Sequence, residues 1–296
     1  MSLLLLLLVP VLLLPALLLG SAYCAYNWGY PAFAGMALLN VLMFAIGVDL
    51  GTVILFASMM IIGGMGGFII KKKIPLARYV LIAPLLVTML FSGGYYYKLM
   101  NGVDMLADSQ KQVTEIFLKR ADVSNEDKEK IIGNINATMD VLRNIVPFAI
   151  FINALGFAAI GYIAVKFCLF ASRKDSPVDG LSAFELNGYV VFGLIGAWAV
   201  VLLAGNENKA LFSLALNAAL IISAFYLVQA FGVISFFLKK NNMPNYLIVM
   251  LGVLLFILSM GAGFFMAILL AGFGLLDFWA DFRKIHTTEN NKSAGA

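Results

Sequence analysis

The chain has 296 residues, of which 62% are hydrophobic and only 12% are charged, and its formal net charge is +4. A soluble domain carries roughly 25% charged residues, so this composition excludes an ordinary water-soluble fold and predicts an all-α, polytopic membrane protein embedded in a lipid bilayer. The small positive excess does not indicate a nucleic-acid partner, because the basic residues lie mostly in short segments beside apolar runs, as membrane orientation requires.

Three apolar runs come first: Leu3–Gly20, Pro31–Gly47 and Thr52–Ile70. Each approaches the roughly 20 residues that a membrane-spanning helix needs. The first run resembles the core of a signal peptide, but no Lys or Arg precedes it, so the positively charged start of a signal peptide is missing. We therefore expect a retained membrane segment.

A cluster of glycines closes the third run, just before the three lysines that begin at Lys71. Gly63 and Gly67 have the G-x-x-x-G spacing that lets two membrane helices approach closely. The cluster is not a phosphate-binding loop, because no Lys-Ser or Lys-Thr ending follows it. It predicts either close packing within the chain or a docking face for a membrane protein partner.

The run Leu76–Tyr96 is followed by the most charged part of the chain. Eight acidic and seven basic residues lie between Lys98 and Arg143, and apolar residues recur among them at helical spacing. We predict that residues 98–146 form an extracytoplasmic, amphipathic helical hairpin whose second helix leads into the next run, with a kink at Pro147. Above a cavity this hairpin would be a lid, and above a filled bundle it would be a docking surface or a cap.

Four more apolar runs follow: Ile145–Phe170, Phe184–Ala204, Leu211–Leu238 and Tyr246–Trp279. The last is too long for one ordinary crossing. Gly261 and Gly263 lie near its middle, so a hairpin of two short helices and a single long or broken helix both remain open.

Basic clusters indicate the orientation of the chain in the membrane. They lie at Lys71–Lys73, Arg173-Lys174, Lys239-Lys240 and Arg283-Lys284, and all four can be cytoplasmic if the last run forms a hairpin. The chain then has about nine membrane segments, with eight as the alternative. This arrangement predicts a single multi-pass domain over residues 1–296 in the cell (inner) membrane, with the N-terminus outside, the C-terminus cytoplasmic and a disordered cytoplasmic tail at 285–296.

Four amide side chains lie inside three of the apolar runs: Asn40, Asn153, Asn217 and Gln229. An amide in hydrocarbon needs hydrogen-bond partners, so these side chains face other helices or a cavity. They are either links between helices or the lining of a polar pocket for a small-molecule ligand.

Catalytic groups are missing from the sequence. The single histidine, His286, lies in the polar tail, and no hydrolase or zinc-protease motif occurs. Asp49, at a segment boundary, is the only weak candidate for a carboxylate within the membrane, which argues against an autonomous ion-driven pump. We expect no enzyme activity, no cofactor and no metal.

The end of the last run carries charges at helical spacing. Asp277, Asp281 and Lys284 share one face, and Asp277 is expected to pair with Arg283 or Lys284 at the cytoplasmic boundary. Alternatively, Asp277, Asp281 and Arg283 form a docking point for a cytoplasmic or membrane partner.

This region also carries a resemblance. Gly274-Leu275-Leu276-Asp277 followed by Asp281-Phe282-Arg283-Lys284 resembles the closing signature of the YybS-like family of bacterial membrane proteins, which has no established activity. Members of that family are distantly similar to the substrate-binding S components of energy-coupling-factor transporters and to the rod-shape protein MreD, a likeness at the level of fold alone. The resemblance therefore implies a helical bundle, with two functions open: an S-component-like substrate-binding or transport subunit, or a non-enzymatic structural or interaction protein of the cell envelope.

Overall fold

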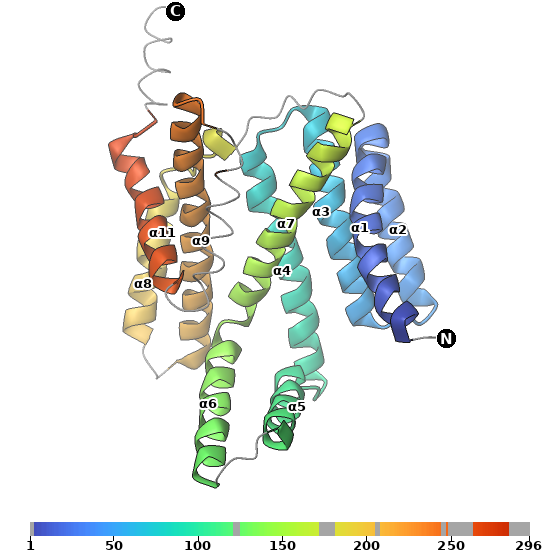
Figure 1. Cartoon of the computed structure of the whole chain (residues 1–296), viewed down its shortest axis with the longest axis vertical. Helices are drawn as coiled ribbons and strands as arrows, with labels where there is room; N and C mark the ends of the chain where they lie inside the picture. The colour runs from blue at the N-terminus through green and yellow to red at the C-terminus, as the bar shows by residue number, and fades with distance from the viewer. Residues whose placement is uncertain are drawn as a thin grey trace, which may run out of the picture. The chain divides into compact units, whose positions relative to one another are not determined.

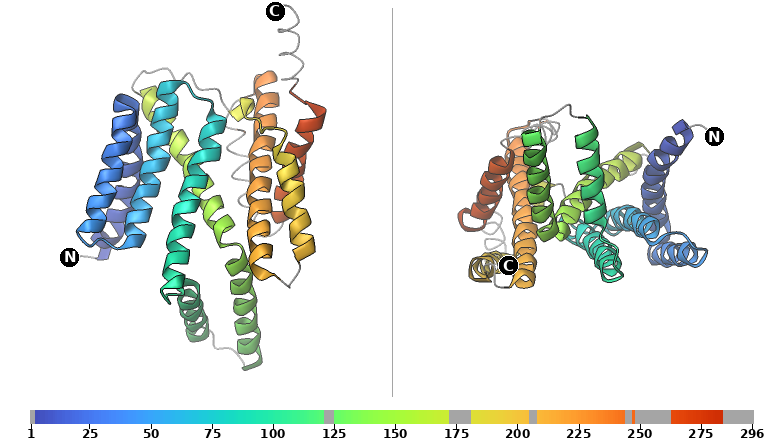
Figure 2. Two further views of the ribbon diagram at one scale, coloured as in Figure 1. Left: turned by 180° about the vertical axis from the view of Figure 1, so that it is seen from behind. Right: turned by 90° about the horizontal axis from the view of Figure 1, so that it is seen from below.

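The computed structural model describes residues 3–120, 125–171, 181–204, 208–243, 247 and 263–283, and Figures 1 and 2 show the helices that they form. Within these ranges every regular element is a helix, as predicted. In chain order the elements are α1 (Leu3–Trp28), α2 (Tyr30–Ala45), α3 (Leu50–Lys72), α4 (Leu76–Met100), α5 (Met105–Arg120), α6 (Asn125–Asn144), α7 (Val146–Ala171), the short 3₁₀ helix η1 (Leu181–Ala183), α8 (Val190–Ala204), α9 (Lys209–Lys240) and α11 (Gly263–Ala280).

By length and composition, the described helices include three that are able to cross a membrane: Leu50–Lys72, Arg78–Met100 and Lys209–Lys240. A fourth span results if Lys128–Asn144 and Val146–Ala159 are counted together, although these two segments are bent by 77° relative to each other. Three apolar helices are shorter: Tyr30–Ala45, Val190–Ala204 and Phe265–Ala280. The predicted total of nine segments is therefore not confirmed, and the break predicted near Gly261 lies outside the described residues.

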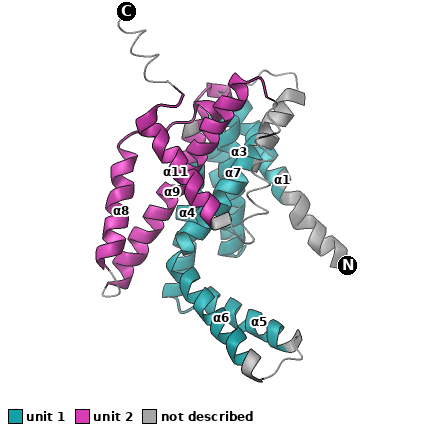
Figure 3. Cartoon of the chain, turned by 60° about the vertical axis from the view of Figure 1, so that its left-hand side comes forward, with its two compact units in different colours: residues 1–68, 82–173 teal, residues 69–81, 174–296 magenta. Residues whose placement is uncertain are grey.

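The chain divides into two compact units by the contacts between its residues, and Figure 3 shows the units in different colours. Unit 1 comprises Met1–Phe68 and Ile82–Arg173, and unit 2 comprises Ile69–Leu81 and Lys174–Ala296. Each unit therefore combines segments that are distant in the sequence.

In unit 1, α1 and α3 cross at the glycines that the sequence singled out. A Cβ atom added to Gly63 would lie 2.0 Å from the carbonyl oxygen of Leu18, and one added to Gly67 would lie 2.0 Å from that of Ala22. No side chain fits at such distances, so the two backbones touch directly. Ala25, on the same helix as Leu18, is fully buried. This crossing is the close packing that a G-x-x-x-G spacing permits.

The charged insertion folds into the helical hairpin α5–α6. Asp104 closes its base: one carboxylate oxygen accepts the backbone N–H groups of Leu106 and Ala107 at 3.1 and 3.0 Å, and the other lies 3.2 Å from Arg143 Nη2. Farther along, Gln110 Nε2 donates to Asn136 Oδ1 at 2.6 Å. The hairpin is thus tied at two levels.

The kink expected where the hairpin meets the membrane is confirmed. Helix α6 ends at Asn144, α7 begins at Val146, and the chain bends there by 77°. Pro147 occupies the first turn of α7, where its missing N–H costs no hydrogen bond. The bend directs α6 away from the axis of α7 and allows it to return beside α5.

Unit 2 is built around the long helix α9, with α8 and α11 packed along it (Figures 1 and 3). Gly274 permits the contact of α11, because a Cβ atom there would lie 2.0 Å from the carbonyl oxygen of Tyr226. The apolar run predicted to begin a helix at Phe184 does so only at Val190. Phe184 and Leu186 are instead buried in the segment that precedes α8.

Candidate functional site

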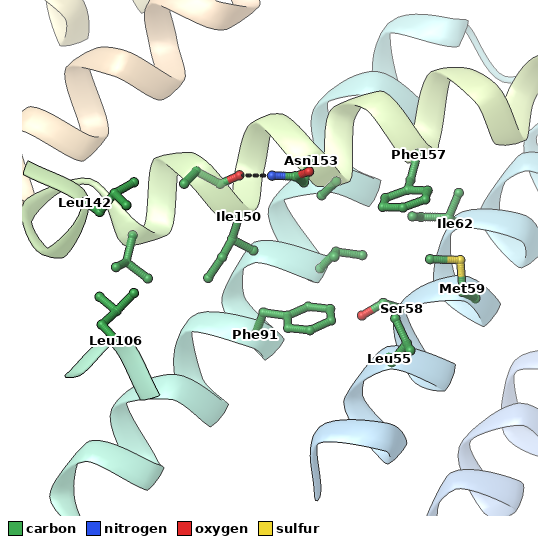
Figure 4. Close-up of a pocket in the computed structure, with 14 residues that line it drawn as sticks. Leu55, Ser58, Met59, Ile62, Phe91, Leu106, Leu142, Ile150, Asn153 and Phe157 are labelled. Atoms are coloured by element: carbon green, nitrogen blue, oxygen red, sulfur yellow. Dashed lines mark hydrogen bonds between the residues drawn. The ribbon is translucent and has the colours of Figure 1, made fainter. Parts of the chain in front are cut away.

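A cavity of about 340 Å³ lies within unit 1, between α3, α4 and α7. Figure 4 shows the side chains that line it, and Leu55 on α3, Phe91 on α4 and Ile150 on α7 represent its three walls. Most of the lining is aliphatic or aromatic because each helix directs apolar residues of its membrane run toward the space. The arrangement suits an apolar ligand.

The hairpin α5–α6 contributes to the same cavity. Leu106 near the start of α5 and Leu142 near the end of α6 are both lining residues, and Figure 4 places them together at one end. The amphipathic stripe predicted for the insertion therefore faces the cavity at these two positions. Because Asp104 and Arg143 join the two helices close to these leucines, the ion pair holds this end of the cavity in place.

Two polar side chains interrupt the apolar lining. Ser58 Oγ donates to the carbonyl oxygen of Ile54 at 2.7 Å, and Asn153 Nδ2 donates to that of Ala149 at 2.8 Å. Each side chain thus donates its hydrogen bond to a backbone carbonyl oxygen of its own helix. Asn153 Oδ1 accepts no hydrogen bond from the described residues, so its acceptor is available to a ligand.

A second hollow of about 320 Å³ adjoins the first and is bounded by α3, α4, α5 and α7. The two share Phe91, Leu106, Val146 and Ile150 as lining residues. The second hollow also reaches Lys98, the last basic residue of α4 and the only lining residue with a full charge. The two hollows together therefore have an apolar end, in the first hollow, and a basic end at Lys98, in the second.

Asp49 is an acidic residue directly before the start of α3. It caps the helix: Thr52 donates both its backbone N–H, at 3.1 Å, and its hydroxyl to the carboxylate. The hydroxyl hydrogen bond, followed by the backbone one and with a smaller contribution from Lys98, holds the pKa of Asp49 below its ordinary value. Asp49 is fully exposed and serves as a helix cap, so it does not line the hollow.

The structure describes the surroundings of each of the four predicted amides. Asn153 lines the cavity, whereas Asn40 lines a separate hollow of about 310 Å³ between α2 and α3, donating to the Met36 carbonyl oxygen at 2.8 Å. Asn217 and Gln229 belong to unit 2. Asn217 donates to the carbonyl oxygen of Ser213 on its own helix, at 2.7 Å.

Gln229 is part of a buried polar network in unit 2. Its amide nitrogen donates to Asp277 Oδ2 at 3.2 Å, and its oxygen accepts the backbone N–H of Leu186 at 3.2 Å. Arg283 donates to the same Asp277 oxygen through Nη2 at 2.6 Å and Nε at 3.1 Å. The predicted pairing of Asp277 with Arg283 is confirmed, but it is buried rather than at a surface, with side chains 3% and 1% exposed.

The residues predicted to dock a partner are mostly occupied within the chain. Gly63 and Gly67 lie against α1, so this face is not open to another protein. Asp277 and Arg283 point into unit 2, and Asp281, which is partly exposed, is the remaining member of that group at the surface. No group of three or more potential metal ligands occurs in the described part of the chain.

Sequence reasoning identified Asn153 but not Ser58 or Lys98. A serine bonded to its own helix leaves no trace in an apolar run, and Lys98 was grouped with the charged insertion. The position of Lys98 at the junction of an apolar run and that insertion was the available signal, because a residue there lies at the mouth of any cavity beneath the insertion.

A family model described as predicted membrane protein (DUF2232) matches residues 1–278. The chain therefore belongs to this family, whose description states a location in the membrane and no activity. No curated protein and no solved structure matches the chain.

Proposed function

We propose that this member of the DUF2232 family of membrane proteins is a substrate-binding subunit of a membrane transport system, comparable to an S component, that holds an apolar small molecule in the unit 1 cavity. The observation that carries the proposal is a cavity with apolar walls on three helices and two leucines of the α5–α6 hairpin at one end. Its volume of about 340 Å³ lies at the lower end of the range for small-molecule sites, roughly 300–1,000 Å³.

The chemistry of the lining favours binding over catalysis. Among the described lining residues only Ser58 and Asn153 have polar side chains, and these described residues include no base or acid that could activate either of them. Burial of apolar ligand surface contributes about 25 cal/mol per Å². A non-enzymatic role in capture and transfer is therefore the function that these groups support.

The proposal includes a topology. The basic clusters of the sequence support nine crossings in the inner membrane, with the N-terminus outside, the α5–α6 hairpin outside and the C-terminus in the cytoplasm. In that orientation the hairpin acts as an outer lid. The resemblance of the C-terminal signature to YybS-like proteins, and through them to S components, adds support at the level of fold.

The alternative function is a structural or interaction protein of the cell envelope, comparable to MreD. The observation that favours it is the apolar surface of the hairpin, where Ile116, Phe117 and Val141 are each more than half exposed. Such side chains suit contact with lipid or with another protein. On this alternative the cavity holds no ligand in the purified protein.

The test compares a substitution that fills the cavity with a matched control. Asn153→Trp places a bulky side chain in the cavity, and Asn27→Trp changes a residue that makes the same hydrogen bond, 2.8 Å to the carbonyl oxygen four residues earlier, but lies outside it. Each protein is purified in detergent and studied by native mass spectrometry, and small molecules are identified after extraction with organic solvent.

The expected result is a bound small molecule in the wild type and in Asn27→Trp, and its loss from a folded Asn153→Trp protein. Folding is verified by the thermal unfolding midpoint. Equal occupancy in all three proteins, or an empty cavity in every preparation from native membranes, would contradict the proposal and favour the envelope function.

A further inference from the structure

We infer that the ligand of unit 1 is an amphiphile with one hydrocarbon chain and an anionic head, and that Lys98 binds the head. The inference rests on the proposed function, and it adds a ligand class and a residue that determines specificity. It begins from the adjacency of the two hollows, which share Phe91, Leu106, Val146 and Ile150 as lining residues. A ligand longer than either hollow would pass between these four side chains.

The two ends of this joint site differ in polarity. At the inner end, Leu55, Met59 and Ile62 of α3 offer only hydrocarbon and sulfur to a ligand. The outer end includes the Lys98 ammonium and the Ser109 hydroxyl. A ligand with an apolar tail and a polar head matches both ends, whereas a wholly apolar ligand would leave the outer end unmatched.

Lys98 brings a positive charge to the outer end. Lys98 is partly buried, and its side chain makes no hydrogen bond or ion pair with the residues that the structure describes. Asp104 and Arg143, two further charged groups of unit 1, already pair with each other at 3.2 Å. The nearby Asp49 carboxylate accepts hydrogen bonds from Thr52 at the start of α3 and makes no ion pair with Lys98, whose charge is the last of the causes that lower the pKa of Asp49.

The side chain of a partly buried lysine without a hydrogen-bonding partner favours an anion, because its charge is stabilised by an opposite charge within contact distance. Gly51 makes room at the same place: a Cβ atom there would lie 3.8 Å from Lys98 Nζ and 3.1 Å from Asp49 Oδ1. The absent side chain leaves the ammonium accessible from the α3 side. A phosphate or carboxylate head on one alkyl chain provides the matching chemistry.

The experiment measures binding of dodecyl phosphate and of dodecanol to full-length protein in detergent, by competition monitored with native mass spectrometry. Lys98→Gln is compared with Lys98→Arg and with the control Lys130→Gln, an exposed lysine of α6 that lines neither hollow. The filled variant Asn153→Trp is measured in parallel. Inorganic phosphate and nanodiscs of phosphatidylglycerol are included to separate a single-chain ligand from a free anion and from bulk lipid.

Lys98→Gln is expected to weaken the binding of dodecyl phosphate about tenfold or more, as for the loss of one charge-assisted contact. The binding of dodecanol should be unchanged. Lys98→Arg and Lys130→Gln should bind both compounds like the wild type. Asn153→Trp should weaken the binding of both compounds. Inorganic phosphate should not compete, and excess phosphatidylglycerol should not displace dodecyl phosphate.

Equal weakening of both compounds in Lys98→Gln, or none, would overturn the head-group assignment. Competition by inorganic phosphate would overturn the need for a chain, and displacement by phosphatidylglycerol would replace the single-chain ligand with bilayer lipid. Dodecanol binding that Asn153→Trp abolishes would sustain the proposed function in each of these cases. Unchanged binding of both compounds in Asn153→Trp would refute the proposed function itself.

Discussion

Removal of the Arg283 guanidinium is the perturbation for which the structure predicts the largest loss of stability. In Arg283→Met the apolar part of the side chain remains, but four hydrogen bonds disappear. Two go to Asp277 Oδ2, at 2.6 and 3.1 Å, and the other two go to the carbonyl oxygens of Ser182 at 3.1 Å and Phe184 at 2.7 Å. The Asp277 carboxylate, 3% exposed, then keeps one partner, the Gln229 amide at 3.2 Å.

The magnitude follows from the burial of both charges. Breaking a buried ion pair from one side typically costs about 3–5 kcal/mol, because the remaining charge is left without compensation. Asp277 is already incompletely satisfied, since its Oδ1 atom is buried with no hydrogen-bond partner. The unfolding equilibrium constant of Arg283→Met should therefore rise roughly a hundredfold to a few thousandfold. The loss should appear in unit 2, which contains all these residues.

The assay is reversible unfolding in mixed micelles with increasing SDS, followed by tryptophan fluorescence. Arg283→Met, Asp277→Leu and the double variant form a double-mutant cycle. The double variant should be less destabilised than the sum of the single variants by about 1–3 kcal/mol, because it leaves no buried charge. Lys239→Met is the control, since this exposed lysine also contacts the Ser182 segment, donating to Ser182 Oγ at 2.8 Å, and its loss should cost within about 0.5 kcal/mol. Additive single effects, or an Arg283→Met protein as stable as Lys239→Met, would refute the reasoning.

Three further predictions concern unit 1. Gly63→Ala should destabilise the protein by about 1–3 kcal/mol in the same assay, because its Cβ atom would meet the α1 backbone. Gly93→Ala, where the space is open, should be neutral or stabilising by up to about 1 kcal/mol. Equal effects of the two substitutions would contradict the close crossing of α1 and α3. The pKa of Asp49 is lowered chiefly by the Thr52 hydroxyl, so the Asp49 carboxylate stabilises the fold above its unfolded pKa near 3.8. The difference in thermal midpoint between wild type and Asp49→Asn should therefore vanish as the pH falls below that value. A difference that grew on acidification would show the opposite sign of linkage. Arg143→Gln should cost only about 0.2–1 kcal/mol, and less in high salt, because both partners of its ion pair are more than one-third exposed; a salt-independent loss would indicate a role other than charge.

The fold was largely predictable because a membrane helix must satisfy its own backbone and reach across the hydrocarbon. The apolar runs therefore matched helices, and the bend before Pro147 followed from proline chemistry. The structure of the segment that contains Phe184 and Leu186 was not predicted. They are apolar and buried, yet they belong to an irregular segment whose backbone is satisfied from elsewhere: Gln229 accepts the Leu186 N–H, and Arg283 binds the Phe184 carbonyl oxygen. The hydropathy of a segment indicates that it is buried, but it does not distinguish a helix from a loop whose backbone is hydrogen-bonded by side chains.

The candidate site was less predictable because it depends on which helices meet. The sequence indicated Asn153 and an amphipathic insertion, and the structure places both at one cavity. The spacing of Gly63 and Gly67 predicted a close crossing but could not identify the partner helix. Lys98 belongs to the site only because α5 lies beside the end of α4, which is a property of the tertiary structure.

The amides explain why polar residues within apolar runs were an incomplete guide to a pocket. Asn40, Asn153 and Asn217 each donate to the carbonyl oxygen four residues earlier on their own helix, at 2.8, 2.8 and 2.7 Å. Asparagine can therefore satisfy its donor inside a membrane helix without a second helix. Gln229, whose side chain is one methylene longer, reaches two other segments instead. It follows that an asparagine in such a run can present mainly an acceptor oxygen to its surroundings, so a ligand of the unit 1 cavity gains a hydrogen bond from Asn153 only if it carries a donor along its chain.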